Sequence, residues 1–151
     1  MYVGLIIVFT AFEDEKLKEY LIASLNTITN ARICLVCNDN DEEVLEILSE
    51  IARDCANTNV VSTKRNKSTH SSIRAGARYL SNQLNLKHVG FIVDLDSFKI
   101  VEVVKEYIQH QKEIVTLHKI EQENKAFKPT FYQSLFPIPK YLEKIVSNPI
   151  A

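Results

Sequence analysis

The sequence of 151 residues lacks a strong charge imbalance and lacks a long apolar run. Its 18 basic and 19 acidic residues give a formal net charge of -1, so bulk electrostatics predicts neither a nucleic-acid nor a membrane partner. Because no apolar stretch reaches the length of a membrane span and no basic region precedes the apolar start at Tyr2, we expect no integral membrane segment and no signal peptide. Composition therefore predicts a cytoplasmic protein, and 46% hydrophobic residues suffice for one core.

Cysteine is also scarce, with three residues, yet two of them form a suggestive pair. Cys34 and Cys37 have the C-x-x-C spacing of redox and zinc sites. However, residues 33–37 form an apolar, β-rich run, and residues three apart on a strand face opposite sides of a sheet. We therefore interpret both as core cysteines.

Apolar runs typical of buried strands alternate with amphipathic stretches, and no internal repeat interrupts them. This pattern predicts an α/β fold with three layers, α/β/α, around a mainly parallel, Rossmann-like sheet. The predicted strands are 3–9, 31–37, 59–62, 89–93 and 113–117. The predicted helices are 15–25, 41–54, 69–84, 97–110 and 139–146.

The C-terminal residues 121–151 differ in character from residues 1–120, because aromatic residues and prolines replace the alternation. They include Phe127, Pro129, Phe131, Tyr132, Phe136, Pro137, Pro139 and Tyr141. We expect this part to wrap around the α/β core of residues 1–120 within a single domain. Its aromatic side chains are candidates for packing or for a homodimer contact.

Polar side chains cluster after the predicted strands. In chain order they are Glu13 and Asp14, Asn38 and Asp39, the basic segment 64–67, and Asp94 and Asp96. In an open parallel sheet these positions lie along the carboxyl edge, where ligands bind at the point of strand-order reversal. Carboxylates, an amide and basic groups on one edge suit a nucleoside diphosphate and its divalent metal.

The most informative of these clusters is Asp94-Leu95-Asp96, which ends the apolar run 89–93. Residues two apart on a strand point the same way, and two like charges in a cleft require a cation or strong donors. Mg²⁺ or Mn²⁺ bound together with phosphate is the candidate cation. The alternative is that the two carboxylates are solvated at the start of a helix, with Asp96 or Ser97 as its N-cap.

Four short motifs occur in order within this alternating frame. The first is Thr10-Ala11-Phe12-Glu13-Asp14-Glu15, and the second spans residues 37–42 and reads C-N-D-N-D-E. The third spans residues 66–76 and reads N-K-S-T-H-S-S-I-R-A-G. The fourth is Asp94-Leu95-Asp96.

Together the motifs resemble those of GT-A-fold glycosyltransferases that use nucleotide sugars, particularly the family 2 group. In that family the corresponding motifs read P-x-Y-N-E-E, V-N-D-G-S-T-D-E, N-K-G-K-x-x-A-x-R-A-G and the metal-binding D-x-D. The third match is the most specific, although Ser68, Thr69 and Ser72 depart from it. The resemblance covers residues 3–100 and implies a GT-A-like domain that is shortened at its C-terminus.

The resemblance implies transfer of a sugar from a nucleotide-diphosphate sugar to an unknown acceptor, with Mn²⁺ or Mg²⁺ as cofactor. It implies that Asp39 contacts the base, that Asp94 contacts the ribose or the metal, and that Asp96 holds the metal. It also places Thr10, Ala11, Phe12, Glu13, Asn66, Lys67 and Arg74 among the donor-binding residues. No acceptor-site motif follows residue 100, so the sequence identifies no catalytic residue; His118 is a candidate third metal ligand, with a core histidine as the alternative.

Two other functions stay open. A catalytically inactive nucleotide-sugar-binding module would retain only the donor half, as the short C-terminal part suggests. A metal-dependent nucleic-acid enzyme of the Toprim type would combine Glu13 with Asp94 and Asp96, and the basic segment 64–67 would suit a phosphate backbone. This second alternative leaves Asp39 and the 66–76 motif without a role.

Overall fold

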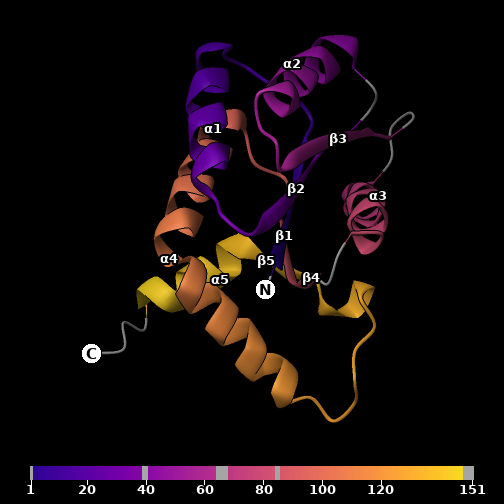
Figure 1. Cartoon of the computed structure of the whole chain (residues 1–151), viewed down its shortest axis with the longest axis vertical. Helices are drawn as coiled ribbons and strands as arrows, with labels where there is room; N and C mark the ends of the chain where they lie inside the picture. Colours follow the sequence, from indigo (N-terminus) through magenta and orange to yellow (C-terminus); the bar gives the residue numbers. More distant parts are fainter. Residues whose placement is uncertain (1, 39–40, 64–67, 84–85, 148–151) are drawn as a thin grey trace.

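The computed structural model describes residues 2–38, 41–63, 68–83 and 86–147, which form one five-stranded sheet flanked by helices (Figure 1). The strands are β1 (Tyr2–Phe9), β2 (Ala31–Cys37), β3 (Thr58–Ser62), β4 (Leu86–Ile92) and β5 (Phe136–Pro137). Their order is β3-β2-β1-β4-β5, and every neighbouring pair is parallel. The predicted three-layer, Rossmann-like α/β fold is confirmed.

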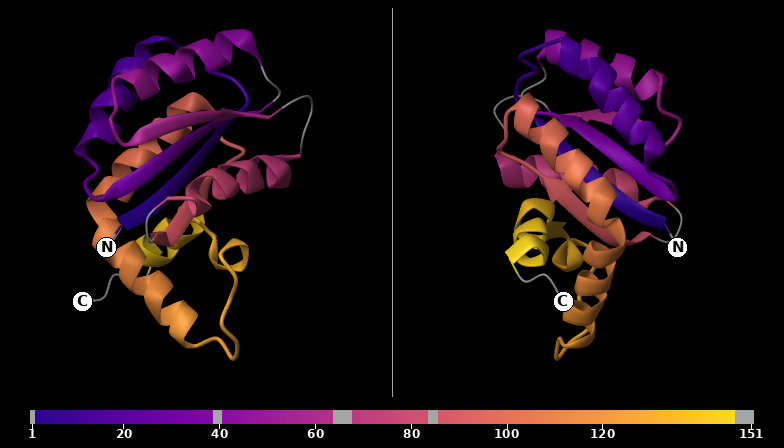
Figure 2. Two further views of the ribbon diagram at one scale, coloured as in Figure 1. Left: turned by 45° about the vertical axis from the view of Figure 1, so that its right-hand side comes forward. Right: turned by 90° about the vertical axis from the view of Figure 1, so that its left-hand side faces the viewer.

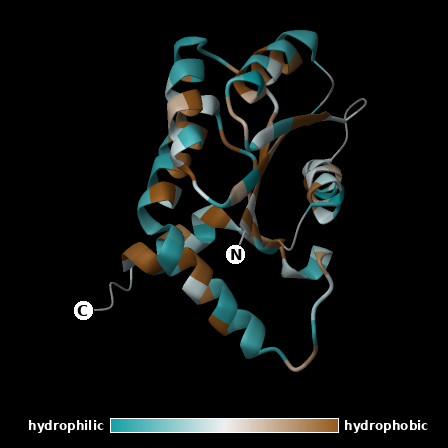
Figure 3. Ribbon diagram, in the orientation of Figure 1, coloured by the Kyte–Doolittle hydropathy of each residue, from teal (hydrophilic) through white to brown (hydrophobic). Residues whose placement is uncertain are grey.

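The helices divide between the two faces of the sheet (Figure 2). One face carries α1 (Lys16–Thr27), α2 (Glu42–Arg53) and α4 (Ser97–Glu123), and the other carries α3 (Thr69–Ser81). Helix α5 (Ile138–Ser147) packs against α4 near the end of the chain. Hydrophobic residues face the sheet and hydrophilic residues face outward on these helices (Figure 3). None of the helices in the described ranges combines the length and the apolar character that a membrane crossing requires.

The sheet separates two cores because strand residues alternate between its faces. On β1, Leu5 and Ile7 pack with α1, α2 and α4, whereas Ile6 and Val8 pack with α3. The same alternation puts the C-x-x-C pair, Cys37 and Cys34, into the first and second core respectively. Burial raises the pKa of the Cys34 thiol to about 12, so this thiol stays protonated and unreactive. The interpretation as core cysteines is confirmed.

The predicted strand at 113–117 is wrong. Helix α4 continues to Glu123, with one residue of non-helical backbone at His110 (φ -118°, ψ 18°). The β-branched residues of this run favour a strand, but Ile114 and His118, four residues apart, are both buried on one side of the helix. Packing of that side overrides the local preference. The fifth strand is instead the two-residue β5, which pairs Gly90 with Phe136 and Phe91 with Pro137.

The C-terminal aromatic residues divide into buried and exposed groups. Phe136 and Tyr141 are buried and their rings stack with centroids 4.5 Å apart, so packing explains them. Phe127 is 61% exposed and Tyr132 is 37% exposed. The suggested homodimer contact through this part stays a prediction.

Candidate functional site

The strand order reverses between β1 and β4, so the segments that follow these two strands mark the expected ligand site. Backbone bonds align the neighbouring strand ends on this edge. The Asn38 N–H donates to the carbonyl of Phe9 (2.9 Å), and the Thr63 N–H donates to the carbonyl of Cys37 (3.0 Å). The ends of β1, β2 and β3, with Asn38 and Thr63, therefore lie side by side along the carboxyl edge.

Asp94 and Asp96 leave β4 through a turn rather than along the strand. Strand β4 ends at Ile92, and Asp94 has a left-handed backbone with φ 59°. The expectation that the two carboxylates share one face of a strand is therefore wrong. Left-handed backbone is uncommon outside glycine, but aspartate and asparagine adopt it more readily than other residues, and Asn30, which precedes β2, also has it (φ 53°).

Each of the two carboxylates is exposed and has one oxygen in a hydrogen bond. Asp94 Oδ1 accepts from the Thr69 hydroxyl at 2.9 Å, which joins the turn to the start of α3. Asp96 Oδ1 accepts from the Lys99 N–H at 2.9 Å, so Asp96 is the N-cap of α4. The helix-cap alternative is confirmed for Asp96. A carboxylate that caps through one oxygen still has a second oxygen for a ligand.

Glu13 joins the segment after β1 to the start of α4. Its Oε2 accepts from the Ser97 N–H (3.1 Å) and from the Ser97 hydroxyl, and its own N–H donates to Ser97 Oγ (3.2 Å). The bond from the Ser97 hydroxyl is the main cause that lowers the pKa of the Glu13 carboxyl. An ionised Glu13 at the N-terminus of α4 also suits the helix dipole.

Helix α3 is tied to the ends of two strands through hydroxyl groups. Asn38 Oδ1 accepts from the hydroxyls of Ser72 (3.0 Å) and Thr63 (3.3 Å), and Ser72 is fully buried. Thr69 supplies the bond to Asp94. Sequence reasoning missed Thr63, Thr69 and Ser72, and it named Ser97 only as an alternative N-cap of α4 rather than as the partner of Glu13. For Thr69 and Ser72 the only signal was that both depart from the family motif, and only the fold shows what the hydroxyls contact.

The other predicted donor-binding residues have varied surroundings. Thr10 and Ala11 are exposed, and the Phe12 ring packs against Phe9 with centroids 5.7 Å apart. Arg74 is exposed, and its guanidinium lies over the Tyr132 ring, 5.0 Å from the centroid, which links α3 to the C-terminal part. Three further candidates, Asp39, Asn66 and Lys67, fall outside the described residues.

The carboxylates at this edge suit Mg²⁺ or Mn²⁺ only together with other ligands. Within residues 2–38, 41–63, 68–83 and 86–147, no group of three or more His, Cys, Asp or Glu residues could hold a metal. Mg²⁺ is commonly held by one or two carboxylates together with substrate phosphates and water, and the second oxygens of Asp94 and Asp96 fit that pattern. His118 is not a third ligand: it is fully buried and bonded to His88 and to the Ser134 carbonyl, which confirms a core histidine.

An open hollow of about 740 Å³ lies at the opposite, amino edge of the sheet, where β4 begins. Leu86, Gln122 and Phe131 are among its lining residues, and it contains none of the predicted site residues. The candidate site is therefore the carboxyl edge, with its cluster of polar groups at the strand-order reversal. No protein-family model matches the sequence, and no curated protein is significantly similar to it.

Proposed function

We propose that the protein binds a nucleotide-diphosphate sugar with Mn²⁺ or Mg²⁺ at the carboxyl edge and transfers the sugar to an acceptor. The observation that supports this most is the position of the Asp94–Asp96 segment. It lies directly after β4, at the strand-order reversal, with both carboxylates exposed and with a left-handed residue between strand and helix. Two acidic groups in such a position suit a phosphate-bound divalent cation.

One of the two helices that begin at this edge supports a diphosphate ligand. Helix α3 begins at Thr69, which contacts Asp94, and α4 begins at Ser97, directly after Asp96. The N-terminus of a helix carries a partial positive charge and favours bound phosphate. At α4 the N–H groups of Ser97 and Lys99 already bond to the carboxylates of Glu13 and Asp96, whereas the N-cap of α3 is the neutral Ser68, so α3 is the helix that suits a phosphate.

In this proposal Asp94 and Asp96 bind the metal through the oxygens that the fold does not use. When bound, the metal neutralises charge that develops on the departing nucleoside diphosphate. Asp39, Asn66, Lys67, Arg74 and the residues after β1 are the proposed contacts to base, phosphates and sugar. No described residue is assigned as the base that activates the acceptor.

The test is a calorimetric titration of nucleotide sugars and nucleoside diphosphates with and without Mn²⁺. Asp96→Asn keeps a good N-cap but removes the charge, so it should bind the donor about tenfold or more weakly while stability changes by only a few tenths of a kcal/mol. Asp54→Asn is the matched control, because Asp54 is an exposed carboxylate that follows α2. If no member of the panel binds the wild type, the proposal fails.

The two alternatives predict different results in the same experiment. A binding module without activity would bind the donor but show no transfer or hydrolysis with Mn²⁺. A Toprim-type nucleic-acid enzyme would bind nucleic acid in a strongly salt-dependent manner and ignore nucleotide sugars.

A further inference from the structure

Two buried histidines face each other between the sheet and α4. His88 on β4 and His118 on α4 are 6% and 0% exposed, and their Nδ1 atoms are 2.7 Å apart. The other ring nitrogen of His118, Nε2, lies 2.8 Å from the carbonyl oxygen of Ser134. This chain of bonds joins β4, near its amino end, to the residues that immediately precede β5.

The partners of His118 determine where the protons are. A carbonyl oxygen only accepts, so His118 Nε2 must carry a hydrogen. A neutral imidazole has one N–H, so His118 Nδ1 is an acceptor and His88 Nδ1 must donate to it.

Gln122 agrees with this assignment once its amide is rotated. In its present orientation Gln122 Nε2 lies 3.2 Å from His118 Nε2, so two N–H donors would face each other. Its Oε1 is the one buried side-chain nitrogen or oxygen without a partner in the described part of the chain. Exchanging the two amide atoms removes the opposed donors, because Oε1 can then share the His118 Nε2 hydrogen with the Ser134 carbonyl.

The surroundings favour the neutral pair. Burial is the main cause that lowers the pKa of both histidines, and it lowers that of His88 to about 4. The charged and titratable groups around the pair are Lys87 on β4, Lys119 and Glu121 on α4, Lys125 after it, and Tyr141 and Lys144 on α5, which bond to Glu121. His118 and the positive charges of Lys87 and Lys119 further lower the pKa of His88. At His118 the bond to the Ser134 carbonyl and the charge of Glu121 raise the pKa, Lys125 lowers it by less than Glu121 raises it, and burial outweighs all three.

The bonding pattern limits how many protons the pair can accept. One added proton fits on His88 Nε2 and leaves the existing bonds intact. A second proton would have to occupy His118 Nδ1, and two N–H groups would then oppose each other across 2.7 Å. Full protonation is therefore incompatible with the contact between the rings.

The contact with His118 helps to hold a segment whose Phe136, Ile138 and Tyr141 side chains are also buried in the core. The C-terminal segment, residues 131–147, comprises the short 3₁₀ helix Tyr132–Ser134, β5 and α5, and β5 pairs with β4 at only two positions. The His118 ring also packs on Phe136, with centroids 4.4 Å apart. We propose that the His88–His118 pair is a proton-operated latch, which holds the C-terminal segment against β4 while at most one of the two rings is protonated and releases it when both rings are protonated.

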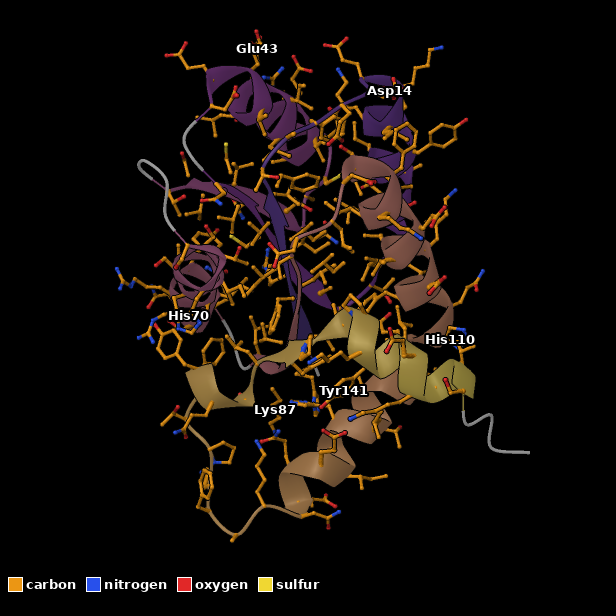
Figure 4. The ribbon with its side chains drawn as sticks, turned by 180° about the vertical axis from the view of Figure 1, so that it is seen from behind. Asp14, Glu43, His70, Lys87, His110 and Tyr141 are labelled. Atoms are coloured by element: carbon orange, nitrogen blue, oxygen red, sulfur yellow. The ribbon has the colours of Figure 1, made fainter. Side chains whose placement is uncertain are left out.

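Hydrogen exchange of backbone amides tests the latch. In the released state each histidine has an ordinary pKa near 6.5 and is protonated below this pH. Each histidine then shifts the equilibrium constant towards the released state by up to about tenfold per pH unit. We expect protection of amides 136–147, corrected for intrinsic exchange, to fall about tenfold or more between about pH 6.5 and 5, while β1 and β2 keep their protection. In His88→Gln/His118→Gln the same amides should show no such pH response. His70→Gln is the control, because His70 is exposed on α3 (Figure 4).

Two results would overturn the latch. One is an unchanged pH response of the C-terminal amides in the double variant. The other is a set of imidazole ¹⁵N shifts in the wild type that places the proton of His118 on Nδ1, or that shows both rings titrating with a normal pKa. The ¹⁵N spectra need only the wild type, so they decide the question even if the double variant does not fold.

Discussion

At the scale of single residues, the acidic side chains of the candidate site already stabilise the fold without a ligand. Asp96 caps α4 and Glu13 bonds to Ser97, the first residue of the same helix. The turn that carries the D-x-D sequence is thus fixed from both sides. A substitution at either carboxylate changes stability and ligand binding together, and the two effects must be measured separately.

The Glu13–Ser97 contact gives the first prediction about stability. Ser97→Ala removes the hydroxyl that bonds to the carboxylate, and we expect it to lower the free energy of unfolding by about 1–2 kcal/mol. Urea denaturation measures this, and Ser81→Ala, an exposed serine at the end of α3, is the control. In a double-mutant cycle with Glu13→Gln, a coupling energy near zero would contradict the assigned contact.

Gly76 provides a prediction in which two effects have opposite signs. Alanine is a better helix former than glycine by about 1 kcal/mol, so helix propensity alone predicts stabilisation. A Cβ at position 76 would however lie 2.7 Å from Ile6 Cγ2 and 3.1 Å from Val36 Cγ2 on the sheet. We expect Gly76→Ala to destabilise by about 1–3 kcal/mol in urea denaturation. Ala75→Gly measures the propensity cost on the same helix, and a Gly76→Ala protein more stable than wild type would disprove the close approach.

At the scale of helices and strands, the sequence predicts what depends on local pattern. Strands β1 to β4 and most helices follow from apolar runs and helical spacing, and the ends of those strands place the polar clusters on one edge. The helix after His110 could not be predicted from local pattern. Residues 114–116 read Ile-Val-Thr, which favours a strand, and only contacts with distant elements make them helical. Strand β5 has only two residues, and one of them is proline, so it shows no alternating pattern that would identify a strand. The hydroxyl bonds from Thr69 and Ser72 likewise depend on which strand ends α3 meets.

The docking of α5 depends on the lack of a side chain at Gly90. A Cβ there would lie 2.6 Å from Ile138 Cγ1 and 2.9 Å from the Phe136 ring, so we expect Gly90→Ala to destabilise by about 1–3 kcal/mol and to displace β5 and α5. Amide exchange of residues 136–147 would report the displacement. Adding Ile138→Ala removes the clashing carbons of Ile138 and leaves only the contact with the Phe136 ring, so the double variant should lose less stability than the sum of the two single variants. Strict additivity would contradict the steric argument.

At the scale of the whole molecule, the buried histidine on β4 links stability to pH. The pKa of His88 is about 4 in the folded state against 6.5 for an ordinary histidine, so unfolding takes up a proton between these values. The free energy of unfolding should therefore be highest above pH 6.5 and fall by about 1–3 kcal/mol as pH decreases towards 4, below which this histidine has no further effect. Urea denaturation at several pH values measures the slope. His88→Gln should flatten it and His70→Gln should not.

The two-residue strand β5 also has a consequence for how the chain is made. Its partner β4 is synthesised before the whole of α4, and β5 is synthesised after α4. The edge of β4 therefore stays uncovered for the time that α4 takes to be made, while β1 to β4 can already pair. An open strand edge is a template for pairing with other chains. Once β5 arrives, Pro137, which has no N–H, makes the new outer edge a poor template for another strand. We therefore expect the newborn protein to depend most on chaperones between the synthesis of β4 and that of β5.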